Sequence, residues 1–186
     1  MIPPHTLSHV LPPFINNDPR NRANISPYDT DLCEVIDRFG TGSARVEILR
    51  GLLEFRTALL GVGIVSGYQW ISGSFTEGIE TLESRPPGDV DIVTVAHRPA
   101  HAKDDSSWWK FFSENQDLFD PVANKTRFHC DTYYIDLQNL PEYLVLDVSY
   151  WYGLFSHRRG GLWKGMLRIP LQGDDVAAQI RLAGVV

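Results

Sequence analysis

Two aspartates, Asp89 and Asp91, open an otherwise apolar run that continues as Ile92-Val93-Thr94-Val95. Side chains two residues apart on a β-strand project from the same face, so these carboxylates are expected to lie side by side. At that separation they repel each other and raise each other's pKa, unless a cation neutralises them. Hard oxygen ligands on a rigid strand suit Mg²⁺ or Mn²⁺, which commonly take further ligands from a substrate's phosphates. The pair indicates a divalent-metal site, and a strand end with two solvated acids is the plainer interpretation.

A second feature, Gly73-Ser74, follows the strand-like segment 68–72. Backbone N–H groups and a hydroxyl at a strand-to-helix turn can bind a phosphate. The alternative is an ordinary turn, in which Gly73 provides the geometry and Ser74 caps a helix. A glycine-serine turn, a proline-rich loop over 85–88 and then the strand with Asp89 and Asp91 form a rarer conjunction than any of the three alone.

A third carboxylate would complete a metal site, and the predicted strand 128–137 offers Asp131 and Asp136. The two positions differ in parity, so they lie on opposite faces of that strand. Parity alone does not choose between them. Asp136 lies near the end of the strand, beside Gln138-Asn139, and is more simply explained as a turn residue.

The elements that must position these residues predict an α/β (α+β) fold, with a mixed sheet covered by helices. Residues 1–30 are expected to form an extended, proline-rich arm docked on the body, and residues 31–186 the domain itself. The acids Glu77, Glu80 and Glu83 recur at a spacing of three, which predicts the solvated face of a short helix. Hydrophobic spacing predicts helices over 29–39, 43–61 and 106–120, and composition predicts strands over 68–72, 89–95, 128–137, 143–152 and 163–171.

A basic segment lies near the C-terminal end. Four of the 17 Lys and Arg residues fall within eleven positions, although the whole chain has a net charge of -6. Lys164 and Arg168 are four apart and would share a face on a strand. The segment is either a solvated hairpin or a set of phosphate contacts for a nucleotide or an acceptor. Its residues are His157, Arg158, Arg159, Lys164 and Arg168.

Composition excludes several classes of protein. The 186 residues are 43% hydrophobic and 22% charged, which excludes disorder over the whole length and leaves room for one domain. The acidic balance excludes DNA binding through bulk charge. Cys33 and Cys130 make neither a disulfide framework nor a zinc motif. Neither a signal peptide nor an apolar run of membrane-spanning length is recognised, so we expect a cytoplasmic protein without a membrane partner.

On these residues the chain resembles the nucleotidyltransferase superfamily, which has the DNA polymerase β-like fold. The signature of that superfamily is a glycine-serine after a strand, a strand with two acids in alternation, and a later strand with a third acid. Further likeness to a small bacterial family of nucleotidyltransferase-like proteins extends to Ser26-Pro27-Tyr28 and Lys164-Gly165. The matching segments are Ile71-Ser72-Gly73-Ser74, Asp89-Val90-Asp91 and Cys130-Asp131-Thr132.

The resemblance implies a mixed sheet of the nucleotidyltransferase type and two-metal transfer of a nucleotide from an NTP to a hydroxyl. Asp89 and Asp91 would hold Mg²⁺ (or Mn²⁺). Asp131 would complete the site on the nucleophile side and could accept the hydroxyl proton. Gly73 and Ser74 would bind the β- and γ-phosphates, with Lys164 and Arg168 as further nucleotide-binding residues.

The acceptor implied by the resemblance is a protein side chain or an RNA end. Small bacterial members of the superfamily often belong to toxin–antitoxin or phage-defence modules, so a cognate partner protein is expected. The alternative is a non-catalytic nucleotide-binding or partner-binding module, such as an antitoxin or regulator, that keeps the same fold.

Overall fold

A computed structural model describes residues 1–185 of the chain. Its five strands form one mixed sheet in the order β1-β5-β2-β3-β4. Strand β2 is antiparallel to both β3 and β5, whereas β3 is parallel to β4 and β1 is parallel to β5. The predicted mixed α/β architecture is therefore confirmed. The strands are β1 (Tyr28–Asp29), β2 (Gly67–Ser72), β3 (Val90–Ala96), β4 (Cys130–Asp136) and β5 (Leu167–Pro170).

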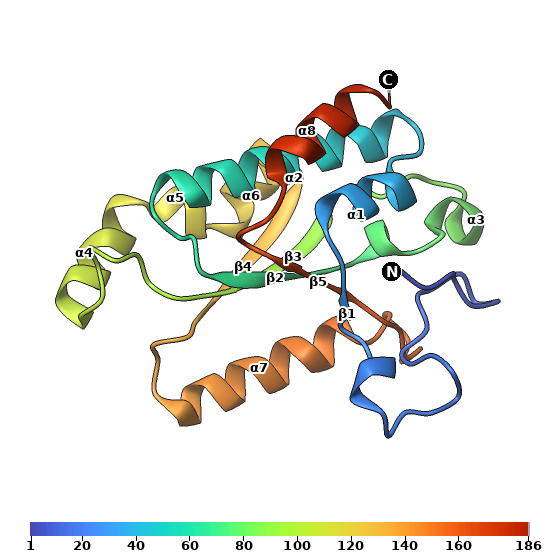
Figure 1. The fold of residues 1–186 in the computed structure, drawn as a ribbon, viewed down its shortest axis with the longest axis horizontal. Coiled ribbons are helices and arrows are strands. Elements are labelled where there is room, and N and C mark those ends of the chain that lie inside the picture. Colours follow the sequence, from blue (N-terminus) through green and yellow to red (C-terminus); the bar gives the residue numbers. More distant parts are fainter. Residues whose placement is uncertain (186) are drawn as a thin grey trace.

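Helices cover both faces of the sheet unequally. In Figure 1, α2, α5, α6 and α8 lie on one side of the sheet and α7 lies on the other. Within residues 1–185, no helix is long and apolar enough to cross a membrane. The eight α-helices of the described chain are α1 (Leu32–Phe39), α2 (Ser43–Gly61), α3 (Ile79–Glu83), α4 (Asp105–Glu114), α5 (Gln116–Phe119), α6 (Pro121–Phe128), α7 (Pro141–Phe155) and α8 (Asp175–Ala183).

Alternation along β3 divides its side chains between two cores. Ile92 belongs to the larger core, which lies under the helices α1, α2 and α8. Val93 and Val95 belong to the smaller core, which contains Phe155 of α7. Because neighbouring side chains point to opposite faces, Asp91 shares the α7 face with Val93 and Val95.

The same alternation in β4 decides which acid accompanies Asp91. Cys130 belongs to the larger core and Ile135 to the smaller core beside α7. Asp131 therefore shares the α7 face with Ile135, and Asp136 lies on the opposite face. There Asp136 forms an ion pair of 2.7 Å with Arg98. Its Oδ1 also accepts the backbone N–H of Gln138 at 2.9 Å, as expected of a turn residue.

The prediction of a strand over 143–152 was wrong, because this segment lies inside helix α7. Its aromatic and β-branched residues have strand composition. However, Leu144, Val148, Trp151 and Phe155 recur at spacings of three and four and pack against the sheet. Pro141 occupies the first helical turn, where its missing N–H costs no hydrogen bond. In this segment the helical spacing of the apolar residues, and not the residue composition, determines the secondary structure.

Proline also marks a helix start where a helix end was expected. The helix expected over 106–120 is divided into α4 and α5 and ends at Phe119, and Pro121 is the first residue of α6. The Asp120 side chain caps α6 by accepting the backbone N–H of Val122 at 2.9 Å. This start places the last turn of α6 so that Lys125 reaches Asp89, the residue before β3.

The segment 1–30 lies against the body of the domain through apolar side chains. Val10 and Leu11 are buried, and Leu11 belongs to the larger core. The backbone N–H of Gly165 donates to the Leu11 carbonyl at 2.7 Å. At the end of the segment, Tyr28 and Asp29 form β1 at the edge of the sheet.

Candidate functional site

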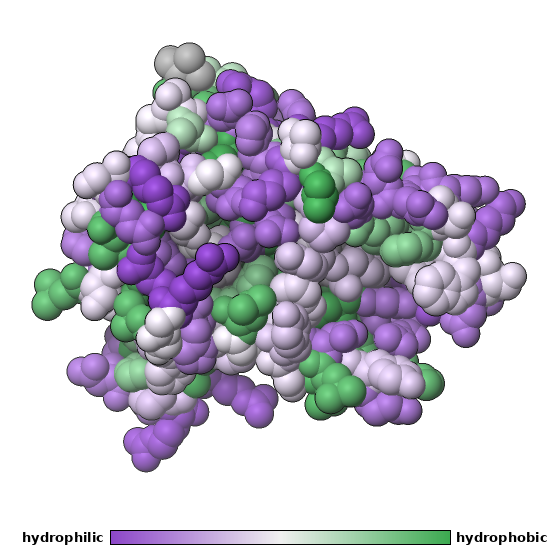
Figure 2. Space-filling model, turned by 180° about the vertical axis from the view of Figure 1, so that it is seen from behind, coloured by the Kyte–Doolittle hydropathy of each residue, from purple (hydrophilic) through white to green (hydrophobic). Residues whose placement is uncertain are grey.

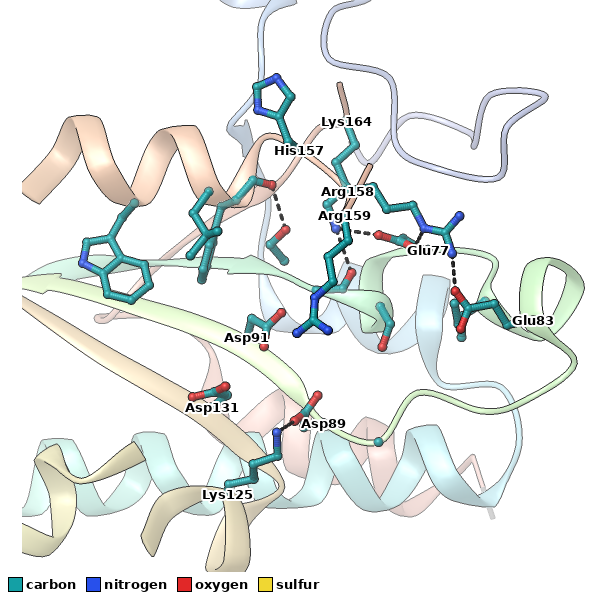
Figure 3. A pocket seen from close by; sticks show the side chains of 18 of the residues that line it. Glu77, Glu83, Asp89, Asp91, Lys125, Asp131, His157, Arg158, Arg159 and Lys164 are labelled. Atoms are coloured by element: carbon teal, nitrogen blue, oxygen red, sulfur yellow. Dashed lines mark hydrogen bonds and ion pairs between the residues drawn. The ribbon is translucent and has the colours of Figure 1, made fainter. Parts of the chain in front are cut away.

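Asp89, Asp91 and Asp131 converge at one end of β3 and β4. Asp91 and Asp131 are partners in the parallel register of the two strands, and Asp89 lies one residue before β3. One carboxylate oxygen of each lies within 4.8 Å of those of the other two. Figure 3 shows the three side chains turned toward a common space. Three carboxylates at that separation, two of them on paired strands, fit a divalent cation with oxygen ligands.

The electrostatics of Asp91 agree with that fit. Burial first, and then the neighbouring charges of Asp89 and Asp131, raise the pKa of its carboxyl to about 6. A cation bound among the three acids would offset both effects. The cluster is therefore unfavourable by itself and suited to a positive ligand.

Gly73 allows the turn after β2 to lie directly against Asp91. Its φ is +81°, and a Cβ built on it would be 2.3 Å from Oδ2 of Asp91. Any side chain here would displace the carboxylate, which explains the glycine. The following residue, Ser74, begins a 3₁₀ turn over Ser74–Thr76 and is half-buried. Gly73, not Ser74, is therefore the N-cap residue of this turn.

The acids lie in an open cleft of about 830 Å³. Five of the 17 Lys and Arg residues of the chain line it, beside five acids and an apolar wall from α7. Such mixed charge suits a ligand that carries both phosphates and a metal ion. The cations are Arg85, Lys125, Arg158, Arg159 and Lys164; the acids are Glu77, Glu83, Asp89, Asp91 and Asp131.

Lys125 is a cleft residue that the sequence analysis missed. Its ammonium forms an ion pair with Asp89 across the cleft floor (Figure 3). That hydrogen bond is the main reason why the pKa of Lys125 is raised. From the sequence, Lys125 could have been found only by recognising that α6 begins at Pro121, because that start determines the helical turn on which Lys125 lies. In this structure Asp89 is therefore neutralised by a side chain of the protein.

Glu77 corrects another expectation, because it is not on a solvated helix face. It precedes α3, which begins at Ile79, and it is buried. Its carboxylate pairs with Lys164 at 2.7 Å and with Arg158 at 3.1 Å. Glu77 thus connects the turn after β2 to the basic segment that follows α7.

The basic residues predicted to bind nucleotide occupy different environments. Lys164 is only 4% exposed, and its ammonium also donates to the Gly73 carbonyl at 3.1 Å. Arg168 lies on β5 outside the cleft and donates to Asp29 at 2.7 Å. Strand β5 begins at Leu167, so the expected shared strand face of Lys164 and Arg168 does not exist. Lys164 belongs to the site as a buried support of the turn at Gly73, and Arg168 does not belong to it.

We expect Asp91→Asn to raise the free energy of unfolding in EDTA at pH 7.5 by up to about 3 kcal/mol, since each pKa unit corresponds to about 1.4 kcal/mol. The folded-state pKa of Asp91 lies above its ordinary value, so the folded chain binds this proton more tightly than the unfolded chain. This group therefore lowers stability progressively as the pH rises from about 4 to about 6.

Urea unfolding of both proteins between pH 4 and 8 measures this effect. In the wild type, Asp91 should make the free energy of unfolding fall as the pH rises over that window. Asp91→Asn should remove this part of the pH dependence. A clear loss of stability at pH 7.5 in the variant would instead show that the carboxylate is a structural hydrogen-bond acceptor.

No curated protein and no solved structure matches the chain. One sequence family, described as a family of unknown function (DUF6932), matches residues 3–170. That range includes the turn at Gly73, the three aspartates and the segment from Arg158 to Lys164. Because the match covers most of the chain, the protein belongs to this family, DUF6932.

Proposed function

We propose that this protein is a nucleotidyltransferase, dependent on Mg²⁺ or Mn²⁺, that moves a nucleotide from an NTP to a hydroxyl of a protein or RNA acceptor. The observation that carries the proposal is the meeting of Asp89, Asp91 and Asp131 against the turn at Gly73. Three carboxylates alone would support only a cation site. The turn in contact with that site has the positive φ of Gly73 and the hydroxyl of Ser74, which are suited to a phosphate. It therefore supports a phosphate-bearing ligand as well.

The roles of the side chains follow from their positions. Asp89, Asp91 and Asp131 would hold the divalent ion, which supplies neutralisation of the triphosphate and a lower pKa of the acceptor hydroxyl. The acceptor oxygen forms a bond to the α-phosphorus, the bond to the bridging oxygen breaks, and pyrophosphate leaves. Asp131 would accept the hydroxyl proton. The turn at Gly73 and Ser74 would orient the leaving phosphates.

Transfer of label from radiolabelled NTPs tests the proposal. Each NTP is labelled at either the α- or the γ-phosphate and incubated with the protein, Mg²⁺ or Mn²⁺, and cell lysate as acceptor. We expect the α label to appear on a macromolecule and the γ label to leave as pyrophosphate, with no transfer in EDTA. The double variant Asp89→Ala/Asp91→Ala is the control. Transfer of the γ label would indicate a phosphotransferase instead.

Arg159 supports the phosphate-binding part of the proposal. Arg158, Lys164, Lys125 and Arg85 are each paired with an acid of the cleft. No ion pair of Arg159 is found within residues 1–185, and in Figure 3 its side chain extends into the cleft toward Asp91. It is exposed, and so available to an anion.

We expect Arg159→Gln to weaken NTP affinity by about ten- to a hundredfold, because a charge-assisted hydrogen bond contributes about 1.5–3 kcal/mol. The salt dependence of binding should also become flatter. Calorimetric titration of an NTP with Mg²⁺ at two ionic strengths measures both. Arg168→Gln, outside the cleft, is the matched control. Equal affinities and salt slopes for the two variants would show that the segment does not contact phosphate.

A non-catalytic nucleotide-binding module is the second candidate, and one observation favours it. Lys125 already neutralises Asp89, so part of the positive charge that a metal would supply is built into the chain. A module of this kind would bind an NTP in the calorimeter and transfer no label. Lys125→Gln separates the two candidates: we expect it to strengthen metal binding in an enzyme and to abolish NTP binding in a module that uses Lys125 as its cation.

A further inference from the structure

One side of the cleft is apolar and largely aromatic, and the roles proposed above leave it without a ligand. Its side chains come from α7 and β4 and line the same cleft as the three aspartates. Figure 2 shows green apolar side chains along the lower edge of the molecule, where α7 lies in Figure 1. The apolar side of the cleft continues this surface inward. We call its four residues the apolar wall: Tyr133, Trp151, Leu154 and Phe155.

The apolar wall is fixed to both parts of the candidate site. Tyr133 follows Asp131 by two residues on β4, so the two side chains share a face and start about 7 Å apart along the strand. At the other end of the wall, the hydroxyl of Ser72, the residue before Gly73, donates to the Phe155 carbonyl at 3.0 Å. The wall therefore extends from the turn at Gly73 to the strand that carries Asp131.

Trp151 lies at the centre of the apolar wall. The centroid of its ring is 4.0 Å from that of Tyr133 and 5.9 Å from that of Phe155. These two contacts hold the indole in one orientation before any ligand binds. Trp151 is nevertheless only half-buried, and Leu154, three residues later on the same side of α7, is 53% exposed. The wall is therefore preformed and still accessible.

We propose that the apolar wall binds the base of the NTP, which stacks on Trp151 and packs against Leu154. This inference rests on the proposed function, since it takes the triphosphate to lie at the metal site and the turn at Gly73. An NTP is charged at one end and flat and apolar at the other, and the cleft is divided in the same way. Its volume of about 830 Å³ is also typical of a small-molecule site.

The apolar wall also predicts which bases bind. Its only polar side-chain atoms are the Tyr133 hydroxyl and the Trp151 N–H. Burial and then the Asp131 carboxylate raise the pKa of Tyr133 to about 12, so this hydroxyl lies beside Asp131. The indole N–H lies in the plane of its ring and does not face a base stacked on it. Stacking area alone then selects the base, so purines should bind more tightly than pyrimidines, and adenine about as tightly as guanine.

Calorimetric titration of the full chain with Mg²⁺ tests the proposal. The probes are ATP, GTP, CTP, UTP and inorganic tripolyphosphate, which has the phosphates of an NTP without its base. We expect ATP and GTP to bind at least about tenfold more tightly than tripolyphosphate and within about threefold of each other. CTP and UTP should bind with intermediate affinity, because a pyrimidine offers a smaller ring for stacking.

Variants of Trp151 separate base stacking from a structural role. Trp151→Leu should weaken ATP binding by about ten- to a hundredfold and leave tripolyphosphate binding unchanged, whereas Trp151→Phe should retain most of the ATP affinity. Trp109→Leu is the matched control, since Trp109 is 66% exposed on α4 and does not line the cleft. This control should bind both ligands as the wild type does. Melting temperatures without ligand show that each variant is folded.

Three results would overturn this assignment of the wall and leave the proposed function standing. The first is a wild type that binds ATP no more tightly than tripolyphosphate. The second is an equal loss of both ligands in Trp151→Leu, which would make Trp151 a structural residue. The third is unchanged ATP affinity with slower label transfer in Trp151→Leu, which would assign the wall to the acceptor. Failure of the wild type to bind either ligand or to transfer label would overturn the proposed function and this inference together.

Discussion

Replacing Asp131 by asparagine is expected to reduce nucleotidyl transfer by about a thousandfold while NTP affinity changes little. Charge stabilisation at a metal-assisted transition state contributes several kcal/mol, and a tenfold change in rate corresponds to about 1.4 kcal/mol. Asp131 would act on the nucleophile side of the reaction, so its contribution arises mainly in the transition state. Single-turnover rates with α-labelled NTP measure the loss, and calorimetry measures the affinity.

Two other aspartates serve as controls for Asp131. Asp117 is exposed on α5, and Asp117→Asn should leave both rate and stability unchanged. Asp136→Asn should leave the rate per folded molecule unchanged, but it should lower stability because Arg98 is only 8% exposed and loses its more buried partner, which leaves only the exposed Asp105. A variant Asp131→Asn that retains full turnover would remove Asp131 from the mechanism. Asp136→Asn with the larger loss of rate would reverse the assignment.

Replacing Lys164 by methionine is expected to destabilise the protein by about 3 kcal/mol, or roughly 10 °C in melting temperature for a domain of this size. Lys164 and Glu77 are both 4% exposed in their side chains. Removal of the ammonium leaves the Glu77 carboxylate buried with Arg158 as its remaining partner. The Gly73 carbonyl also loses a donor. Thermal unfolding without nucleotide measures the effect.

The double variant Lys164→Met/Glu77→Gln tests the reason for that loss. Replacing both charges removes the buried carboxylate that has lost its ammonium partner, so most of the stability should return. Arg168→Met is the surface control, because its pair with Asp29 is partly exposed and should contribute at most about 1 kcal/mol. If Lys164 served only to bind phosphate, Lys164→Met would leave the stability measured without nucleotide unchanged.

The local pattern of the sequence was sufficient for the parts of the site that lie close together in the chain. Alternation along one strand placed Asp89 and Asp91 together, and the change of period at residue 68 located β2 and the turn at Gly73. The pattern also narrowed the candidates for the third carboxylate to Asp131 and Asp136, which lie on opposite faces of their strand. These inferences depend on strand geometry alone, which does not change with the rest of the fold.

Residue composition was not sufficient where two periods fit the same segment. The segment 143–152 has the aromatic and β-branched residues of a strand, and it forms α7. Contact with the sheet decides this, because a helix there places Val148 and Trp151 on the smaller core. In the parallel register of β3 and β4, Asp131 is the partner of Asp91, and Asp136 lies on the opposite face. The choice of the third acid therefore followed from a strand pairing that the sequence pattern did not reveal.

What the sequence determined by itself was the set of residues able to do the chemistry: the two aspartates on one strand, the glycine-serine turn and the basic segment. Only the tertiary structure decided which of those residues are available. Lys164 is held by Glu77, Arg168 is outside the cleft, and Lys125 is on Asp89. The physical reason is the range of the interactions. Strand and helix periods are properties of neighbouring residues, whereas an ion pair between residues 87 positions apart exists only after burial has brought them together.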